Sequence, residues 1–208
     1  NGGEIEGTRA FWIQLPGSDA NVAPEINLTV TGGTYRGVTS AISITNGVVN
    51  ISGGTFQAGH DNEGADYGAT YLLNCIDSAY ANGTAHFNIT GGKFVGFNPE
   101  NNASEGEGTN FLSDGYKASD YAGDNKWYVC EALLVMDGNK YFATIKDALA
   151  TLSSADTTVH TIKLVEDIEI DVNYSTYNYP ILVNGFKLVL DLNGKTITAD
   201  WSKYTGTR

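Results

Sequence analysis

Alternating apolar and polar residues recur along the first half of this chain, and each time the alternation meets a pair of glycines. Three clear copies lie at residues 28–37, 49–58 and 87–96, and a degenerate copy lies at residues 2–7. Alternation with a period of two predicts β-strands that bury one face. Because the copies match in residue type as well as in order, they indicate a repeat architecture.

The apolar positions of the copies fall at the same phase. Val30, Ile51 and Ile89 precede the glycines, and an aromatic residue follows them in each copy, at Tyr35, Phe56 and Phe94. A glycine pair permits a bend with positive φ at little steric cost. A further apolar stretch follows three of the copies, at residues 11–15, 41–44 and 71–76.

These three short strands and one bend occupy about 20 residues, which is the length of one coil of a solenoid. The pattern therefore predicts an all-β chain that forms a right-handed parallel β-helix, with Val30, Ile51 and Ile89 in one column. An antiparallel β-sandwich is the alternative, because short strands at regular spacing are also typical of that fold.

The pattern changes after residue 97. Residues 97–125 are polar and turn-rich, and residues 126–130 form an expected closing strand, with Tyr116 and Trp127 sealing the stack. Two domains are predicted. Residues 1–130 would be the C-terminal part of a first β-helix with its closing segment, and residues 131–208 a short capping helix and the first coils of a second β-helix.

The second domain is predicted element by element. A strand at 133–136 and an Asp137-Gly138 turn precede a helix over 144–153, for which Thr144 and Asp147 resemble a capping box. Strands are expected over the following ranges: 161–165, 168–170, 181–183, 187–192 and 195–198.

Charge and cysteine content exclude several classes of function. The net charge of −12 argues against nucleic acid and against anionic membranes, and no run of about 20 apolar residues is present to insert into a bilayer. Cys75 and Cys130 lie far apart in sequence and form no Cys-x-x-Cys motif, so no metal site or cofactor is expected. A disulfide between the two cysteines is left open.

Two segments resemble a known group of proteins. The Asp-Leu-Asn-Gly-Lys turn at residues 191–195, which follows the expected helix and strands, resembles the start of β-helix repeat modules in surface and phage-encoded proteins of gut bacteria. The Gly-Gly-Thr-Phe coils resemble the closing part of such modules. This resemblance implies an extracellular location, on a cell surface or in a virion as a fibre or decoration protein, and it supplies no catalytic residues.

Candidate ligand-binding residues lie where loops leave the expected coils. The loop at 57–70 carries an acidic patch with Asp61 and Asp66, although a solvated loop is the simpler interpretation. Aromatic residues near the same loops could stack on sugar faces, namely Trp12, Tyr67, Tyr71 and Tyr80. The ligand-binding candidates are therefore Trp12, Asp61, Asp66, Tyr67 and Tyr71, and no catalytic residue is assigned.

Other side chains suggest no chemistry by spacing alone. Glycosidases use two carboxyl groups, and nothing selects one pair from the available set of Asp61, Glu63, Asp66, Asp77, Glu105, Glu107 and Asp114. Arg36 is taken as the basic residue of the coils before Lys93, and the three histidines are interpreted as isolated.

The sequence thus predicts a non-catalytic structural or adhesive segment of a surface or virion protein, whose partners are neighbouring parts of a longer chain or assembly. Two alternatives remain: a carbohydrate- or receptor-binding module, with surface glycans as the ligand, and a tailspike-like enzyme that degrades polysaccharides.

Overall fold

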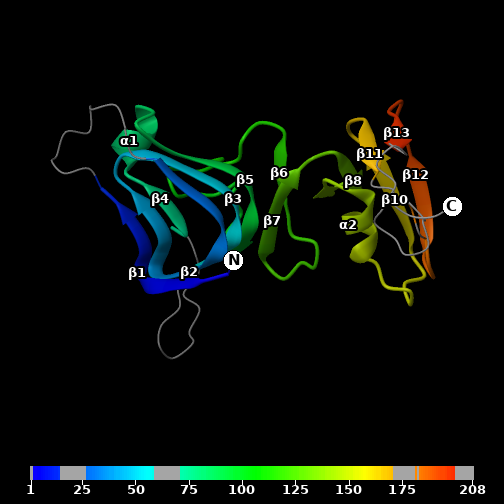
Figure 1. Ribbon diagram of the computed structural model, residues 1–208, viewed down its shortest axis with the longest axis horizontal. Helices are drawn as coiled ribbons and strands as arrows, with labels where there is room; N and C mark the ends of the chain where they lie inside the picture. Colours follow the sequence, from blue (N-terminus) through cyan, green and yellow to red (C-terminus); the bar gives the residue numbers. More distant parts are fainter. Residues whose placement is uncertain (1, 15–26, 59–70, 171–180, 182, 200–208) are drawn as a thin grey trace, which may run out of the picture. The chain divides into compact units, whose positions relative to one another are not determined.

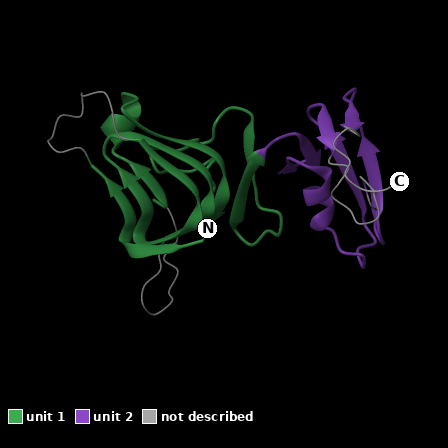
Figure 2. Cartoon of the chain, in the orientation of Figure 1, with its two compact units in different colours: residues 1–130 green, residues 131–208 purple. Residues whose placement is uncertain are grey.

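The computed structural model describes residues 2–14, 27–58, 71–170, 181 and 183–199. The chain divides into two compact units, Asn1–Cys130 and Glu131–Arg208, which are described separately (Figure 2). The described residues are mostly β, with 55% strand and 7% helix.

Unit 1 is built on a seven-stranded sheet with the order β1-β2-β3-β5-β7-β6, in which β4 also pairs with β2 (Figure 1). Its elements are β1 (Glu4–Ile13), β2 (Asn27–Ile44), β3 (Gly47–Ala58), β4 (Leu73–Cys75), α1 (Asp77–Ala81), β5 (Ala85–Val95), β6 (Tyr116–Ser119) and β7 (Lys126–Glu131). Strands β1, β2, β3 and β5 run parallel, because each carries one copy of the repeat and pairs with the next copy.

The repeats stack in the predicted register. Val30 pairs with Ile51, and Ile51 pairs with Ile89, so the three aliphatic side chains form one buried column. Identical phase in successive strands places like residues side by side, which is the main source of stabilisation in a sheet with one buried face.

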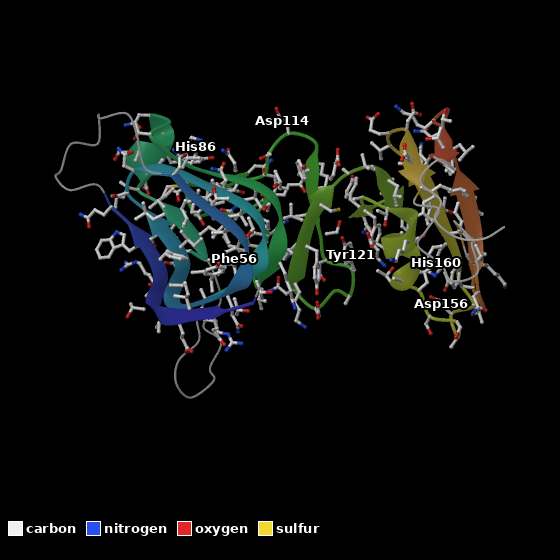
Figure 3. The ribbon with its side chains drawn as sticks, viewed as in Figure 1. Phe56, His86, Asp114, Tyr121, Asp156 and His160 are labelled. Carbon is white, nitrogen blue, oxygen red and sulfur yellow. The ribbon has the colours of Figure 1, made fainter. Side chains whose placement is uncertain are left out.

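Aromatic rings form a second column beyond the glycines. The ring centroids of Tyr35 and Phe56 lie 5.1 Å apart, those of Phe56 and Phe94 lie 5.0 Å apart, and Phe11 extends the series at 5.6 Å from Tyr35. Phe56 lies among the strands of the core (Figure 3). The rings therefore contribute both buried area and stacking to unit 1.

The glycine pairs bend the strands without ending them. The pairing register between β3 and β5 shifts at Ser52, beside the glycines, and the strands continue on both sides. Only the second glycine of each pair has positive φ, at Gly33, Gly54 and Gly92. The bend is thus an irregularity within a long strand.

The parallel series ends at β7, which pairs antiparallel with β5 and places Trp127 beside Phe94. Trp127 and Tyr116 pack against the core, as expected for a closing segment. The polar segment before β6 also contributes to the core, because Phe111 is fully buried.

The prediction of a right-handed parallel β-helix is wrong. The sheets are mixed parallel and antiparallel, and the described residues form no closed solenoid. The ends of β1 and β2 and the strand β4 form a parallel row of three, and Asp77–Ala81 forms a helix directly after β4. The sequence repeat specifies pairing between neighbouring copies, and this pairing is compatible with an open sheet as well as with closed coils.

Unit 2 also mixes strand directions. Its elements are β8 (Leu134–Met136), β9 (Lys140–Phe142), α2 (Ile145–Ala150), β10 (Val159–Leu164), β11 (Ile168–Ile170), β12 (Lys187–Asp191) and β13 (Ile197–Ala199). One sheet has the order β12-β10-β8-β9, in which β8 is antiparallel to both β9 and β10, and a second sheet pairs β11 with β13 in parallel. The expected first coils of a second β-helix are therefore also not observed.

Several local predictions for unit 2 are confirmed. Asp137 and Gly138 have positive φ at the turn between β8 and β9. Thr144 caps α2 by accepting a hydrogen bond from the backbone N–H of Asp147, although the helix ends at Ala150. The strand expected over 181–183 is not found at 181 or 183, and residue 182 lies outside the described residues.

Candidate functional site

The end of β1 lies beside two strand ends, and side chains alternate across them. Phe11, Ile42 and Leu73 form one paired row that faces the core, whereas Trp12, Ser43 and Asn74 form the next row. Successive side chains in a strand point to opposite faces, so this second row lies on the outer face of the sheet.

This outer face contains a hollow of about 290 Å³, which we call the polar hollow. It is lined by Arg9, Thr39, Ser40, Ser43, Tyr71 and Asn74. Residues from β1, from β2, and from β4 and the segment before it therefore meet at one place, although they lie far apart in the sequence.

Arg9 and Trp12 lie at the rim of the polar hollow. The guanidinium carbon of Arg9 lies over the indole ring of Trp12, 4.8 Å from its centroid, which is a cation–π arrangement. Trp12 is 59% exposed and Tyr71 is 52% exposed. Two large aromatic side chains are thus available to a ligand near this hollow.

Ser40 and Ser43 form the deeper part, because they are only 2% and 7% exposed. Their hydroxyl oxygens lie 2.7 Å apart and share one hydrogen bond. That bond uses one hydroxyl hydrogen, so the second hydroxyl retains a donor.

Three side chains of the polar hollow have unused hydrogen-bonding groups. Within the described part of the chain, the guanidinium of Arg9, the hydroxyl of Tyr71 and the amide of Asn74 form no hydrogen bond or ion pair. Several polar groups that converge on one hollow beside apolar rings are typical of a small-molecule site.

A chain irregularity creates this arrangement. The backbone N–H groups of Ala41 and Ile42 both donate to the carbonyl oxygen of Leu72, at 2.9 and 3.3 Å. Both residues are buried, so Ser40 and Ser43 lie on one face although they are three positions apart. In β1, Arg9 pairs with Ser40 and Trp12 pairs with Ser43, so Arg9 and Trp12 are also three positions apart.

The predicted ligand-binding residues have different outcomes. Tyr71 lines the polar hollow, and Trp12 lies beside it through Arg9, so the structure brings these two together. Asp61, Asp66 and Tyr67 lie outside the described residues. Tyr80 packs edge-on against Phe111, with 5.9 Å between ring centroids, and does not join the site.

Sequence reasoning missed Arg9, Ser40, Ser43 and Asn74. It took Arg36 as the basic residue of the repeats, but Arg36 pairs with Glu4 at 2.8 Å. The available signal was the equal spacing of Arg9 and Trp12 in one strand and of Ser40 and Ser43 in the next. Strict alternation places such residues on opposite faces, and only the irregularity reverses this.

The carboxylates of the described residues form no pair in the polar hollow. Asp77 and Glu105 are close enough for their charges to interact. Glu105 accepts a hydrogen bond of 2.6 Å from the backbone N–H of Cys75, and burial raises its pKa. Burial also raises the pKa of the Cys75 thiol, and the two cysteines do not form a disulfide.

A second polar cluster lies in unit 2 around His160, and the prediction that this histidine is isolated is wrong. Its Nδ1 lies 2.8 Å from Asp137 Oδ2 and its Nε2 lies 3.0 Å from Asp156 Oδ2. Figure 3 labels His160 and Asp156 in unit 2. The hydrogen bond to Asp137 and that to Asp156 raise the pKa of His160. Both ring nitrogens have partners, so this cluster links two turns of unit 2.

In the ranges that the structure describes, no helix is long and apolar enough to cross a membrane.

Comparisons of the chain with protein-family models, with curated proteins and with solved structures give no match. The resemblance to surface and phage modules therefore stays a prediction.

Proposed function

We propose that this chain is a non-catalytic, glycan-binding segment of an adhesive protein on a cell surface or virion. The observation that carries the proposal is the meeting of two exposed aromatic residues, Trp12 and Tyr71, with polar side chains that have no hydrogen-bond partner among the described residues.

The chemistry of the polar hollow suits a sugar. The C–H face of a sugar ring packs against an aromatic ring, and its hydroxyl groups need both donors and acceptors. Tyr71 supplies a ring and a hydroxyl, Asn74 supplies a donor and an acceptor, and the serine pair supplies further hydroxyl groups. The hollow is open to solvent at its rim, which suits binding to part of a longer glycan.

Hydrolysis receives no support from the same residues. A glycosidase needs two carboxyl groups about 5 to 10 Å apart around the scissile bond. The described residues that line the polar hollow include no carboxyl group. Binding without turnover is therefore the better supported activity of this site.

A structural role is the second candidate, and a specific observation favours it. Unit 1 carries the stacked rings of Tyr35, Phe56 and Phe94, and the side-chain amide of Asn88 donates to that of Asn50 at 3.0 Å. Such regular columns favour a rigid spacer between neighbouring parts of a longer chain or assembly.

A glycan array tests the binding proposal. The wild-type chain, Trp12→Ala and Tyr71→Ala are applied to the same array, with Val159→Ala as a control in the other unit that also replaces an exposed side chain. We expect retention of a subset of glycans by the wild type and the control, and loss in both hollow variants. A flat array for the folded wild type favours the spacer role.

The surface location has its own test, because its support is the sequence resemblance. Antibodies against this chain should label intact cells or virions that carry the parent protein. Labelling only after lysis or disruption contradicts the location.

A further inference from the structure

Arg9 differs from the other basic side chains described in unit 1. Arg36, Lys117 and Lys126 each pair with a carboxylate, and Lys93 lies over the ring of Tyr128. Arg9 lies at a ligand-sized hollow and forms no ion pair with any described carboxylate. An arginine in this position has charge and donors to offer to a ligand.

We propose that the glycan bound in the polar hollow carries an anionic group, a carboxylate or a sulfate ester, and that Arg9 binds this group. The inference rests on the proposed function and names the class of glycan that the same site selects.

The contact with Trp12 prepares Arg9 for this role. The guanidinium carbon lies 4.8 Å from the centre of the indole, so the ring restricts the long arginine side chain. A cation–π contact uses none of the guanidinium N–H groups as hydrogen-bond donors to oxygen, and these are the groups that bind planar anions in pairs. A side chain ordered before binding loses less conformational entropy when the ligand arrives.

The remaining lining groups are rich in donors. Beside Arg9, the amide of Asn74, the hydroxyl of Tyr71 and one hydroxyl of the serine pair can donate. Among the described residues, no carboxylate lines the polar hollow to compete for these donors or to repel an anion. A carboxylate or sulfate, whose oxygens only accept hydrogen bonds, fits such a set better than a neutral sugar hydroxyl does.

Local contacts must supply this selectivity, because the chain as a whole carries a net charge of −12. Long-range attraction would favour cationic ligands instead. Selectivity for an anion should therefore depend on Arg9 itself and should disappear when its charge is removed.

Calorimetric titration with matched probe pairs tests the proposal. One pair is a galacturonate tetrasaccharide and its methyl ester, which share a skeleton and differ in charge. The other pair is a sulfated galactan tetrasaccharide and its desulfated counterpart. The proteins are the wild type, Arg9→Gln, Arg9→Lys and the control Lys163→Gln, which removes the same charge from an exposed position in unit 2.

We expect the wild type to bind the acidic member of at least one pair about tenfold more tightly than the neutral member, as for a charge-assisted pair. Arg9→Gln should abolish this preference, Arg9→Lys should retain part of it, and Lys163→Gln should retain all of it. The pair that shows the preference distinguishes carboxylate from sulfate.

Two results overturn the inference and leave the proposed function intact: equal binding of acidic and neutral members in both pairs, or a preference that persists in Arg9→Gln. Absence of binding by all four probes also overturns the inference. The proposed function itself fails only when the glycan array is silent as well.

Discussion

The rings of Phe56 and Phe94 lie nearly parallel, with an interplanar angle of 9° and centroids 5.0 Å apart. The two residues also pair directly between β3 and β5, so the contact joins two copies of the repeat. Both side chains are fully buried. Each removes a large apolar area from water and adds stacking between strands.

Replacing Phe56 by alanine should destabilise unit 1 by about 3–5 kcal/mol, because the change leaves a cavity between Tyr35 and Phe94. Urea denaturation followed by circular dichroism measures the effect. Val38→Ala removes an exposed side chain from the same sheet and should change the free energy of unfolding by less than about 0.5 kcal/mol. Equal effects of the two changes would contradict the buried stack.

The first glycines of the repeats offer a matched comparison. A Cβ atom added at Gly53 would lie 2.5 Å from the carbonyl oxygen of Thr31, and one at Gly91 would also collide with backbone, at Ser52. A Cβ atom at Gly32 would meet nothing within 4 Å. The first glycine of the pair therefore leaves no space for a Cβ atom in two copies of the repeat and leaves space in the third.

Gly53→Ala and Gly91→Ala should each lower the free energy of unfolding by about 1–3 kcal/mol, because backbone must move to relieve the contact. Gly32→Ala should be tolerated. Thermal denaturation of the three variants checks the order. Equal tolerance at all three positions would show that the parallel copies do not approach as closely as described.

The negative charge of Glu105 should destabilise the folded state, whereas the hydrogen bond that its carboxylate accepts should stabilise it. Burial raises the pKa of Glu105 more than the hydrogen bond from Cys75 lowers it, and the Asp77 charge adds to the rise. The folded state therefore holds its proton to higher pH than the unfolded state, and stability falls as pH rises from the ordinary value through the folded pKa.

Glu105→Gln keeps an acceptor for the Cys75 N–H and removes the charge, so it should be at least as stable as the wild type at pH 7. Glu105→Ala should lose about 1–3 kcal/mol, because a backbone N–H in a buried strand loses its partner. Urea denaturation of both variants at pH 4 and pH 7 separates the two contributions. A strong loss in Glu105→Gln at pH 7 would contradict this explanation.

His160 should make unit 2 more stable in mild acid than in neutral solution. Hydrogen bonds to Asp137 and Asp156 raise the pKa of His160 above its ordinary 6.5. The associated stability is complete below pH 6.5 and is lost as pH rises through the raised value. Hydrogen bonds from Thr158 and His160 lower the pKa of Asp156 to about 2, so its stabilisation is lost as pH falls below about 4 toward 2.

A proton NMR titration of the His160 ring measures this directly. The pKa should lie above 6.5 in the wild type and should fall in Asp137→Asn and in Asp156→Asn, since each variant removes one charged acceptor. An unchanged pKa in both variants would exclude the two carboxylates as its cause.

The sequence allowed the neighbour relationships of unit 1 to be predicted, because they depend on local alternation. Val30, Ile51 and Ile89 form a column, and Trp127 packs against the core in a closing strand, both as expected from residue type and phase. The antiparallel pairing that places Trp127 beside Phe94 was not predicted. The turn at Asp137 and the cap at Thr144 were also predictable, since both depend on short-range chemistry.

Closure of the fold was not predictable from the same signals. Alternation of apolar and polar residues predicts which residues share a face of a strand, but it does not predict whether the strands close into a solenoid or form an open sheet. The helix at Asp77–Ala81 follows an apolar strand and has no side-chain cap, so the sequence offered no start signal for it. The antiparallel pairing of β8 with β10 depends on contacts between distant residues.

The polar hollow was predicted in part. Exposed aromatic residues near loops pointed to Trp12 and Tyr71, and the structure brings both to one place. Ser40 and Ser43 could not be found by alternation, because Ala41 and Ile42 are both buried between them. Sites at chain irregularities are hidden from any analysis that assumes regular strands.

The most direct test of the account is the indole N–H signal of Trp12 in an NMR titration with a glycan that the array retains, assigned by its loss in Trp12→Phe. The account predicts that this signal shifts progressively with glycan concentration, whereas the indole signal of Trp127, which packs against the core, stays in place. Saturable binding that leaves the Trp12 signal unmoved would contradict the polar hollow as the binding site.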